Sequence, residues 1–521
     1  MLAFLEPLEE LADYQEIVRK RGKAEGILQI AGCVSSQKTH LMYALGDGFE
    51  YRVIVFSSEE KAKQAYEEYK MLEENTFLYP AKDLLFYHAD IKGAALTGKR
   101  MEVLKKLTEK KNREPVTVIT TADAFLDGLP SKEKLWESRI EIEAGAVIDF
   151  QKLQEELVHL GYERESQIEG PGQFAVRGGI LDVYPLTEEI PVRIELWGDE
   201  IDSIRSFDVE SQRSVENMEQ VVIYPATENV EKEEQAVSFA EYFPKEKSLF
   251  FFDEPVRLQE TLEAVEKEYF HSFESRKNAG MTEEADEIRV FQTKEIIEKF
   301  NTRYGIGLTT LETRCGGFKV RDVYSIQAAG VNPYNNSFEM LTQDLKKLKR
   351  QGYRVILVSG SRTRAKRLAE DLRDYDLSSF YSEDMVRTVR PGEIMVVYGC
   401  VAEGYEYPML KFMVISESDI FGKRKKKRRR KVYEGQKIQE FAELKPGDYV
   451  VHENHGLGVY QGIEKVEVDK VTRDYMKISY ADGGILYILA TQMDLIQKYA
   501  GADAKPPKLN KLGTPQWNKT K

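Results

Sequence analysis

Apolar and polar residues alternate along the stretch Gly172–Ser214, which predicts a group of short β-strands. Side chains of a strand point alternately to its two faces, so this two-residue period indicates a sheet with one buried face. Arg193, Glu195 and Trp197 are expected on the opposite face. An exposed Trp beside an Arg indicates a protein-binding surface, because these residue types dominate interaction hot spots. The alternative is that another part of the chain covers Trp197. The apolar row consists of Phe174, Val176, Leu181, Val183, Val192, Ile194 and Leu196.

Three continuous apolar runs near the N-terminus predict buried parallel strands. They are Gly26–Ala31 (GILQIA), Tyr51–Ser57 (YRVIVFS) and residues 115–121 (PVTVITT), with a helix expected at Glu59–Glu74. Strands that are buried on both faces are apolar throughout and rich in β-branched residues, as in the sheets of α/β proteins. Residues 352–372 have the pattern of a strand, a turn and a helix, which predicts a second α/β domain.

The segment Gly32–Thr39 (GCVSSQKT) follows the first strand and is close to the phosphate-binding pattern G-x-x-x-x-G-K-[ST]. Lys38 and Thr39 match the residues that contact phosphate oxygens and magnesium, but Gln37 replaces the second glycine. A side chain at this position is expected to obstruct the tight loop, because the backbone must close around the phosphate.

An apolar strand at 248–254 (SLFFFDE) ends in two carboxylates, as a magnesium-binding acidic motif does. The alternative is a buried strand followed by a polar turn. The Q-x-x-G-R pattern, which supplies transition-state charge stabilisation in ATP-driven motors, does not occur in the sequence. We therefore expect no catalytic residues and no ATP hydrolysis, while weak nucleotide binding stays open. The expected vestigial nucleotide site consists of Gly32, Lys38, Thr39, Asp253 and Glu254.

The C-terminal part of the sequence contains a basic run followed by short strands. Nine consecutive cations at Lys423–Lys431 repel one another, which predicts a solvated linker; nonspecific DNA contact is the alternative. Residues 436–502 have regularly spaced strands and a turn at Asp482-Gly483-Gly484, which predicts a small SH3-like barrel. Acidic residues outnumber basic ones in this barrel, so we do not expect it to bind nucleic acid. His452 and His455 are not accompanied by cysteines or a second carboxylate pair, and no metal site is predicted.

The composition narrows the classes of protein that fit. The net charge of −13 argues against a protein that mainly coats nucleic acid. The 3 cysteines lie far apart, which indicates a reducing compartment. The N-terminus does not have a signal-peptide pattern, and no apolar run reaches the roughly 20 residues that a membrane span needs. We therefore expect a cytoplasmic protein that does not bind membranes.

Two stretches resemble the transcription-repair coupling factor family. Gly172–Ser214, ending in FDVESQRS, is similar to the UvrA-binding module that this family shares with the repair protein UvrB. The string LKPGDYVVHENHGLGVYQGI resembles the family's RNA polymerase-interacting domain, which also occurs in CarD-type regulators. The resemblance implies that Arg177, Arg193 and Trp197 bind UvrA, although the family more often has Phe at the last position.

The same resemblance implies that the last domain binds the β subunit of RNA polymerase by adding a strand to its sheet. The matching edge is Ile463, Glu464, Lys465 and Val466, where charges at the two central positions depart from the family pattern. The chain is then expected to be an adaptor between UvrA and a stalled polymerase. A UvrB-type ATP-dependent helicase and a CarD-type transcription regulator are the alternatives.

The expected fold is a multidomain α/β chain with a small all-β domain at its end. A degenerate RecA/UvrB-like α/β module occupies 1–125 and 216–330, with the α+β UvrA-binding module inserted at 126–215. A middle α/β domain (331–421), a basic linker (422–435), the CarD-like barrel (436–503) and a tail (504–521) follow. We expect the chain to be an N-terminal portion of the family, without a cofactor of its own. The motor that uses ATP and magnesium is expected to lie beyond the tail.

Overall fold

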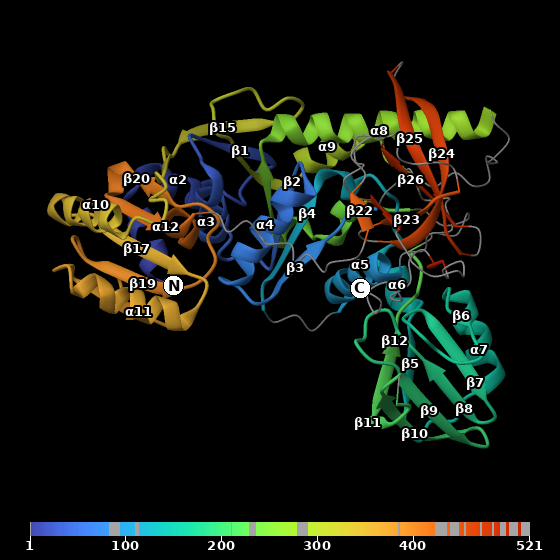
Figure 1. The fold of residues 1–521 in the computed structure, drawn as a ribbon. Coiled ribbons are helices and arrows are strands. Elements are labelled where there is room, and N and C mark those ends of the chain that lie inside the picture. Colours follow the sequence, from blue (N-terminus) through green and yellow to red (C-terminus); the bar gives the residue numbers. More distant parts are fainter. Residues whose placement is uncertain are drawn as a thin grey trace.

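The structure is a computed structural model, and Figure 1 shows its fold. It describes residues 2–82, 94–109, 114–209, 211–228, 236–278, 290–383, 386–422, 435–437, 447–452, 455–468, 471–481, 484–489, 496–499 and 509–511. The basic run Lys423–Lys431 and the tail from 512 lie outside the described residues. Within the described residues, the longest apolar helical stretch falls short of what a membrane crossing requires.

The first α/β domain is built on a parallel sheet of seven strands, with helices on both faces. The strand order is β15 (Val320–Ser325), β1 (Gly26–Ala31), β14 (Tyr304–Leu308), β13 (Ser248–Asp253), β2 (Tyr51–Phe56), β4 (Val116–Thr121) and β3 (Thr76–Tyr79). The three strands predicted from apolar runs are confirmed as β1, β2 and β4. Residues 26–121 and 248–325, which are far apart in the sequence, therefore contribute strands to one sheet.

Two hydrophobic clusters fix this sheet between its helices. On one face lie α1 (Leu2–Leu5), α2 (Ala12–Lys20), α3 (Ser35–Leu45) and α4 (Glu59–Lys70). On the other face lie α5 (Ala94–Thr108), α8 (Pro255–Asn278) and α9 (Thr293–Asn301). Alternate residues of each strand serve the two clusters, since Leu28 and Ile54 face α3 whereas Ile27 and Val53 face α8. Helix α4 ends at Lys70, before the predicted Glu74.

A separate module is inserted between β4 and β13 and projects from the first domain (Figure 1). Helix α6 (Lys132–Glu137) leads into it, and β5 (Ile140–Glu143) pairs with β12 (Gln220–Ile223). Its sheet has the order β11 (Ser214–Met218), β10 (Glu200–Phe207), β9 (Val192–Trp197), β8 (Ile180–Val183), β7 (Gln173–Arg177) and β6 (Glu163–Arg164). Helix α7 (Phe150–His159) covers its apolar face, where Leu153 and Leu157 pack on Phe174, Leu181 and Ile194. The predicted alternation of faces is confirmed.

The middle domain is a second α/β unit with a mixed sheet. Its order is β16 (Ala329–Gly330), β20 (Tyr405–Tyr407), β21 (Phe412–Ile415), β17 (Arg354–Ser359), β19 (Ile394–Tyr398) and β18 (Ser379–Ser382). Its helices are α10 (Phe338–Gln351), α11 (Arg362–Arg373) and α12 (Glu417–Phe421). The strand–turn–helix predicted at 352–372 is confirmed as β17 and α11. Val358, Val397 and Tyr405 share a core with Leu41 of α3, so the first and middle domains pack directly together.

The last domain is an antiparallel sheet of six strands. The order is β22 (Gly435–Lys437), β27 (Ile496–Tyr499), β23 (Tyr449–His452), β24 (Gly456–Val468), β25 (Val471–Ser479) and β26 (Ile485–Leu489). Met476, Ile478 and Tyr480 are buried at every second position, as predicted, and Ser479 pairs with Ile485 across the predicted hairpin. Closure of this sheet into an SH3-like barrel stays a prediction.

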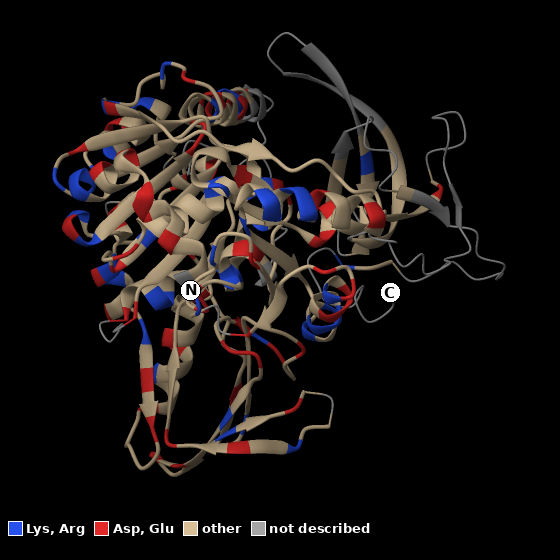
Figure 2. Cartoon of the chain, turned by 90° about the vertical axis from the view of Figure 1, so that its left-hand side faces the viewer, with Lys and Arg blue, Asp and Glu red and all other residues tan. Residues whose placement is uncertain are grey.

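Charge is distributed without a single dominant sign on the face shown in Figure 2. Lys and Arg residues are interspersed with Asp and Glu residues on the helices of the α/β domains. Short-range pairs, rather than one extended field, set the local electrostatics of the sites below.

Candidate functional site

The outer face of the inserted sheet is organised by Asp182, a buried carboxylate on β8. Register places Asp182 directly opposite Arg193 of β9. Arg193 Nε donates to Asp182 Oδ1 at 2.6 Å and Nη2 donates to Asp182 Oδ2 at 2.9 Å. This two-point contact fixes the plane of the guanidinium as well as its charge. The hydrogen bonds that Arg193 donates to Asp182 raise the pKa of Arg193 despite its partial burial.

Arg177 reaches the same carboxylate from the other side. Its Nη2 donates to Asp182 Oδ2 at 2.6 Å. Strand β8 lies between β7 and β9, so the two arginines are brought together through Asp182 and not by direct strand pairing. Arg177 keeps 47 % of its side chain exposed, against 14 % for Arg193. Arg177 therefore retains free donors for a partner, whereas Arg193 is mainly an anchored neighbour.

Further contacts hold Arg193 in place. Its guanidinium lies over the Phe207 ring, 4.3 Å from the ring centroid, and Nη2 donates to Gln212 Oε1 at 2.9 Å. A cation over an aromatic face is favourable at this distance. The predicted UvrA-binding arginines are thus part of a network that also includes Asp182, Phe207 and Gln212. Asp182 was not singled out from the sequence, although an acidic residue in the middle of the apolar strand Ile180–Val183 was a signal that could have identified it.

Trp197 stands at the end of β9 and is open to solvent. Its side chain is 84 % exposed, while the preceding Leu196 packs against the core of the module. The alternative interpretation, in which another part of the chain covers Trp197, is wrong for the described residues. Glu195 is on the same face and pairs with Arg205 of β10. A partner that covered this ring would remove a large apolar surface from water.

The predicted polymerase-binding edge lies in β24. Strand β25 pairs with residues Val459–Val468 of β24, whereas β23 pairs only with Gly456–Val459. The backbone of Ile463, Glu464, Lys465 and Val466 therefore has a neighbour on one side only among the described strands. A register shift between Tyr460 and Gly462 marks the point where β24 leaves β23. The side chains of these four residues lie outside the described ones.

The loop after β1 uses its own backbone donors internally. Gln37 is buried, and its Oε1 accepts the Val34 N–H at 3.1 Å. The Cys33 N–H donates to the Thr309 carbonyl at 3.1 Å. A phosphate-binding loop needs such N–H groups free to face the anion. The Gln37 side chain thus closes the start of α3 with a hydrogen bond as well as by its volume.

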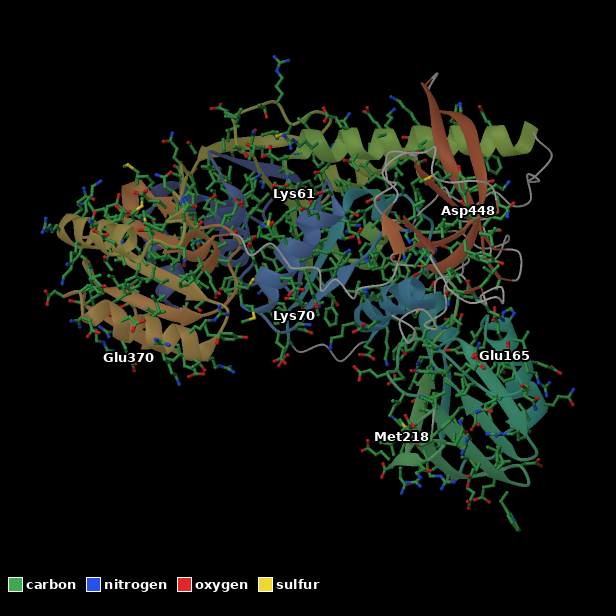
Figure 3. The ribbon with its side chains drawn as sticks, in the orientation of Figure 1. Lys61, Lys70, Glu165, Met218, Glu370 and Asp448 are labelled. Atoms are coloured by element: carbon green, nitrogen blue, oxygen red, sulfur yellow. The ribbon has the colours of Figure 1, made fainter. Side chains whose placement is uncertain are left out.

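Lys38 is paired with the two carboxylates at the end of β13. Its Nζ lies 2.6 Å from Asp253 Oδ1 and 2.7 Å from Glu254 Oε1. Burial disfavours the charged ammonium, but the two carboxylates outweigh it and raise the pKa of Lys38. Lys61 of α4, labelled in Figure 3, adds a contact of 3.1 Å to Asp253. The residues predicted as a vestigial site are therefore together, and their charges compensate one another.

Other members of that site have structural surroundings. Thr39 is buried in α3, and Gly32 has a left-handed φ of +84° at the end of β1. Thr310 donates to Glu254 Oε1 from its N–H at 2.9 Å and from its Oγ1 at 2.7 Å. Glu254 thus has three hydrogen-bond donors within the protein, which lower its pKa despite partial burial.

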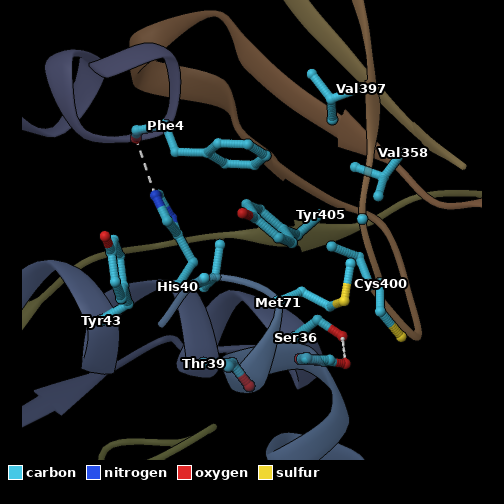
Figure 4. Close-up of a pocket in the computed structure, with 14 residues that line it drawn as sticks. Phe4, Ser36, Thr39, His40, Tyr43, Met71, Val358, Val397, Cys400 and Tyr405 are labelled. Carbon is cyan, nitrogen blue, oxygen red and sulfur yellow. Dashed lines mark hydrogen bonds between the residues drawn. The ribbon is translucent and has the colours of Figure 1, made fainter. Parts of the chain in front are cut away.

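The middle domain closes the surface of α3 beside this loop (Figure 4). A cavity of about 30 Å³ remains between them, lined by His40, Thr39, Cys400 and Tyr405 among others. This volume suits a water molecule, whereas small-molecule pockets measure roughly 300–1,000 Å³. At its rim the Ala402 N–H donates to Glu68 Oε1 at 2.9 Å, so a loop of the middle domain is fixed to α4.

The two histidines of the last domain contact each other. The rings of His452 and His455 have centroids 4.7 Å apart. Burial and the neighbouring ring lower the pKa of His452 to about 4. Among the described residues there is no group of 3 or more metal-binding side chains.

Comparison with known proteins finds two matching domain families. The UvrB interaction domain matches residues 140–229, and the CarD-like/TRCF RID domain matches residues 444–500. The transcription-repair-coupling factor of Bacillus subtilis (strain 168) is 27 % identical over 99 % of this chain and 48 % of its own length. Those of Staphylococcus aureus strains RF122 and MRSA252 are 30 % identical over 86 % of this chain and 43 % of their length. The chain spans about half the length of these curated relatives. It is homologous to the N-terminal half of the transcription-repair coupling factors, with a UvrB interaction domain and a CarD-like/TRCF RID domain.

Proposed function

We propose that this chain is an adaptor that connects the repair protein UvrA to the β subunit of RNA polymerase. The observation that carries the proposal is the exposed Trp197 on the same face of the sheet as two arginines that a buried carboxylate holds in place. The RID domain supports the second half, because part of β24 has no described neighbour on one side. Figure 3 labels Met218 in the inserted module and Asp448 in the last domain, and the two lie in different parts of the molecule.

At the UvrA-binding face the three predicted residues have different tasks. Trp197 supplies a large apolar surface that a partner desolvates, and Arg177 offers free N–H donors to a carboxylate of UvrA. Arg193 contributes mainly as a fixed positive charge on this face of the sheet, since it already contacts Asp182, Gln212 and Phe207.

Binding to purified UvrA tests this assignment. Trp197→Ala should cost ~2 kcal/mol or more of binding free energy, about thirtyfold in affinity, since a hot-spot ring is lost. Trp197→Phe should be tolerated much better, because an aromatic ring still contacts the surface of UvrA that receives Trp197. Met409, which is 85 % exposed in the middle domain, provides a matched control, and Met409→Ala should leave affinity unchanged. An unchanged affinity of Trp197→Ala for UvrA, measured by titration calorimetry, would refute the assignment.

The bridging role needs both partners at once. Immobilised UvrA should retain RNA polymerase only when the adaptor chain is added, and Trp197→Ala should abolish that retention. Strand addition at β24 is the proposed contact with the β subunit, because main-chain hydrogen bonds at an open strand give affinity. Retention of polymerase by UvrA without the chain, or failure of the chain to bridge them, would contradict an adaptor.

We further propose that the first α/β domain does not hydrolyse ATP. Support comes from Lys38, whose charge is compensated by Asp253 and Glu254. Further support comes from Gln37, whose side chain accepts the hydrogen bond of the Val34 N–H in the loop. The UvrB-type helicase is therefore the weaker alternative. A CarD-type regulator leaves the exposed Arg177 and Trp197 without a task. DNA contact through Lys423–Lys431 stays a prediction, and it concerns residues outside the described ones.

A further inference from the structure

A second large apolar side chain stands exposed beside the β9–β10 hairpin. Val147 is 76 % exposed, although it lies in a segment that is firmly attached to the inserted sheet. The Ile148 N–H donates to the Asp199 carbonyl at 2.9 Å, and the Ile201 N–H donates to the Ala146 carbonyl at 2.9 Å. Ala146 and Ile148 pack against the core of the module. Val147 alternates with them and therefore points to the outer face.

Register places Val147 in one row with Trp197. Glu200 pairs with Trp197 on one side and forms an antiparallel bridge with Val147 on the other. Directly opposite residues of neighbouring strands project from the same face of a sheet. Trp197, Glu200 and Val147 are therefore three successive members of a row across the tip of the hairpin, and all three are exposed.

We propose that the UvrA-binding face extends along this row, so that Val147 and Glu200 contact UvrA together with Trp197. This inference rests on the proposed function. UvrA is the expected partner, because the row continues the face of the sheet that carries Arg177 and Trp197. It also lies wholly within residues 140–229, which match the UvrB interaction domain.

The chemistry of the row defines the complementary surface. An indole and an isopropyl group flank one carboxylate, so UvrA must present apolar contacts for both and a donor or cation for Glu200. Isolated exposed apolar residues need no explanation, but two in one row form a patch that a partner can desolvate. A carboxylate introduced at Val147 would then be buried against the apolar contact that UvrA presents there, and would also lie opposite the like charge of Glu200, which is costly.

Val147→Asp tests the proposal, with Val158→Asp as the matched control. Val158 is also an exposed valine of the inserted module, but it lies on α7, which covers the opposite face of the sheet. We expect Val147→Asp to weaken UvrA binding of the full chain at least about tenfold, and Val158→Asp to change it less than about twofold. Melting temperatures of both variants should equal that of the unchanged chain, because neither side chain is packed. If Val147→Asp lowers the melting temperature, Val147→Thr keeps the branched shape and should still weaken binding measurably.

The possible outcomes separate this inference from the proposed function. Loss of affinity in Trp197→Ala with unchanged affinity in Val147→Asp would overturn the extended face and leave the adaptor intact. No effect of either substitution, or no binding of UvrA at all, would overturn both. If Val147→Asp instead abolished self-association in sedimentation experiments while UvrA affinity stayed constant, the row would serve a second copy of the chain and the proposal would be wrong.

Discussion

Removal of the Asp182 carboxylate should loosen the outer face of the inserted sheet. Asp182 is buried and accepts three hydrogen bonds, one from Arg177 and two from Arg193. In Asp182→Ala the largely buried Arg193 loses its carboxylate partner, and breaking a buried pair costs about 3–5 kcal/mol. Arg177 is half exposed, so its pair adds at most about 1 kcal/mol. Gln212 and Phe207 still contact Arg193 in this variant, so we expect the loss of local stability to lie at the lower end of that range, about 3 kcal/mol.

Local hydrogen exchange is the suitable assay, because a chain of several domains does not unfold in one step. Amides of β8 and β9 should exchange about a hundredfold faster in Asp182→Ala, since each 1.4 kcal/mol corresponds to a factor of ten. Asp182→Asn retains the shape and one acceptor and should show a smaller effect.

A second carboxylate on the same face supplies the control. Glu195 pairs with Arg205, but both side chains are partly exposed, so Glu195→Ala should change exchange little. UvrA affinity should also fall in Asp182→Ala, although Asp182 itself is buried, because Arg177 and Arg193 lose their fixed positions. An acceleration of less than about tenfold in β8 and β9 would show that the arginines do not depend on Asp182.

Three further predictions concern the other parts of the chain. Steady-state ATP hydrolysis with DNA present should stay below ~0.1 per second, far under ordinary enzyme turnover; a faster rate that Lys38→Ala abolishes would contradict the paired state of that lysine. Val466→Arg should weaken binding of the polymerase β subunit in a pull-down and leave UvrA binding intact, because a charge at an added strand lacks a partner; loss of both partners would indicate unfolding. Burial lowers the pKa of His40 to about 4 from the model-peptide value of 6.5, despite its hydrogen bond to the Phe4 carbonyl. The folded pKa is the lower one, so the stabilising contribution is present above pH 6.5 and is lost as the pH falls toward 4. Protection factors (intrinsic over observed exchange rates) at the contact between α3 and β20 should therefore fall between pH 8 and pH 5, by about 2 kcal/mol of opening free energy, and His40→Asn should remove that dependence.

Local patterns were sufficient for the elements but not for their partners. Alternation along 172–214 predicted the faces of β7 to β9, because strand geometry fixes them within each strand. The placement of Arg177 required the order of the strands, which inserts β8 between β7 and β9. Asp182 was overlooked because its role depends on which residues lie opposite it.

The nucleotide loop illustrates the same limit. The sequence assigned Lys38 and the Asp253-Glu254 pair to one vestigial site by their motifs, but only the order of the parallel strands explains the distances of 2.6 and 2.7 Å between their charged atoms. Gln37 was predicted to obstruct by its size, whereas its hydrogen bond to Val34 depends on where α3 begins. Val147 had no sequence signal, because its bridge to Glu200 joins a loop to a distant hairpin.

The connection of the inserted module bears on how an adaptor works. Asp127 lies just before the module and Glu228 just after it, and both bind Arg100 of α5. Arg100 is fully buried and stacks on Tyr79, and Lys82 binds Glu228 at 2.7 Å. Such buried ionic networks contribute little net stability but disfavour other arrangements, because separating them leaves unpaired charges. The two segments that connect the inserted module to the first domain are thus both fixed to α5. In the proposed adaptor, a module held in this way would keep UvrA at a defined position relative to the first domain, which would limit the volume that a bound partner explores and raise its effective concentration at the polymerase.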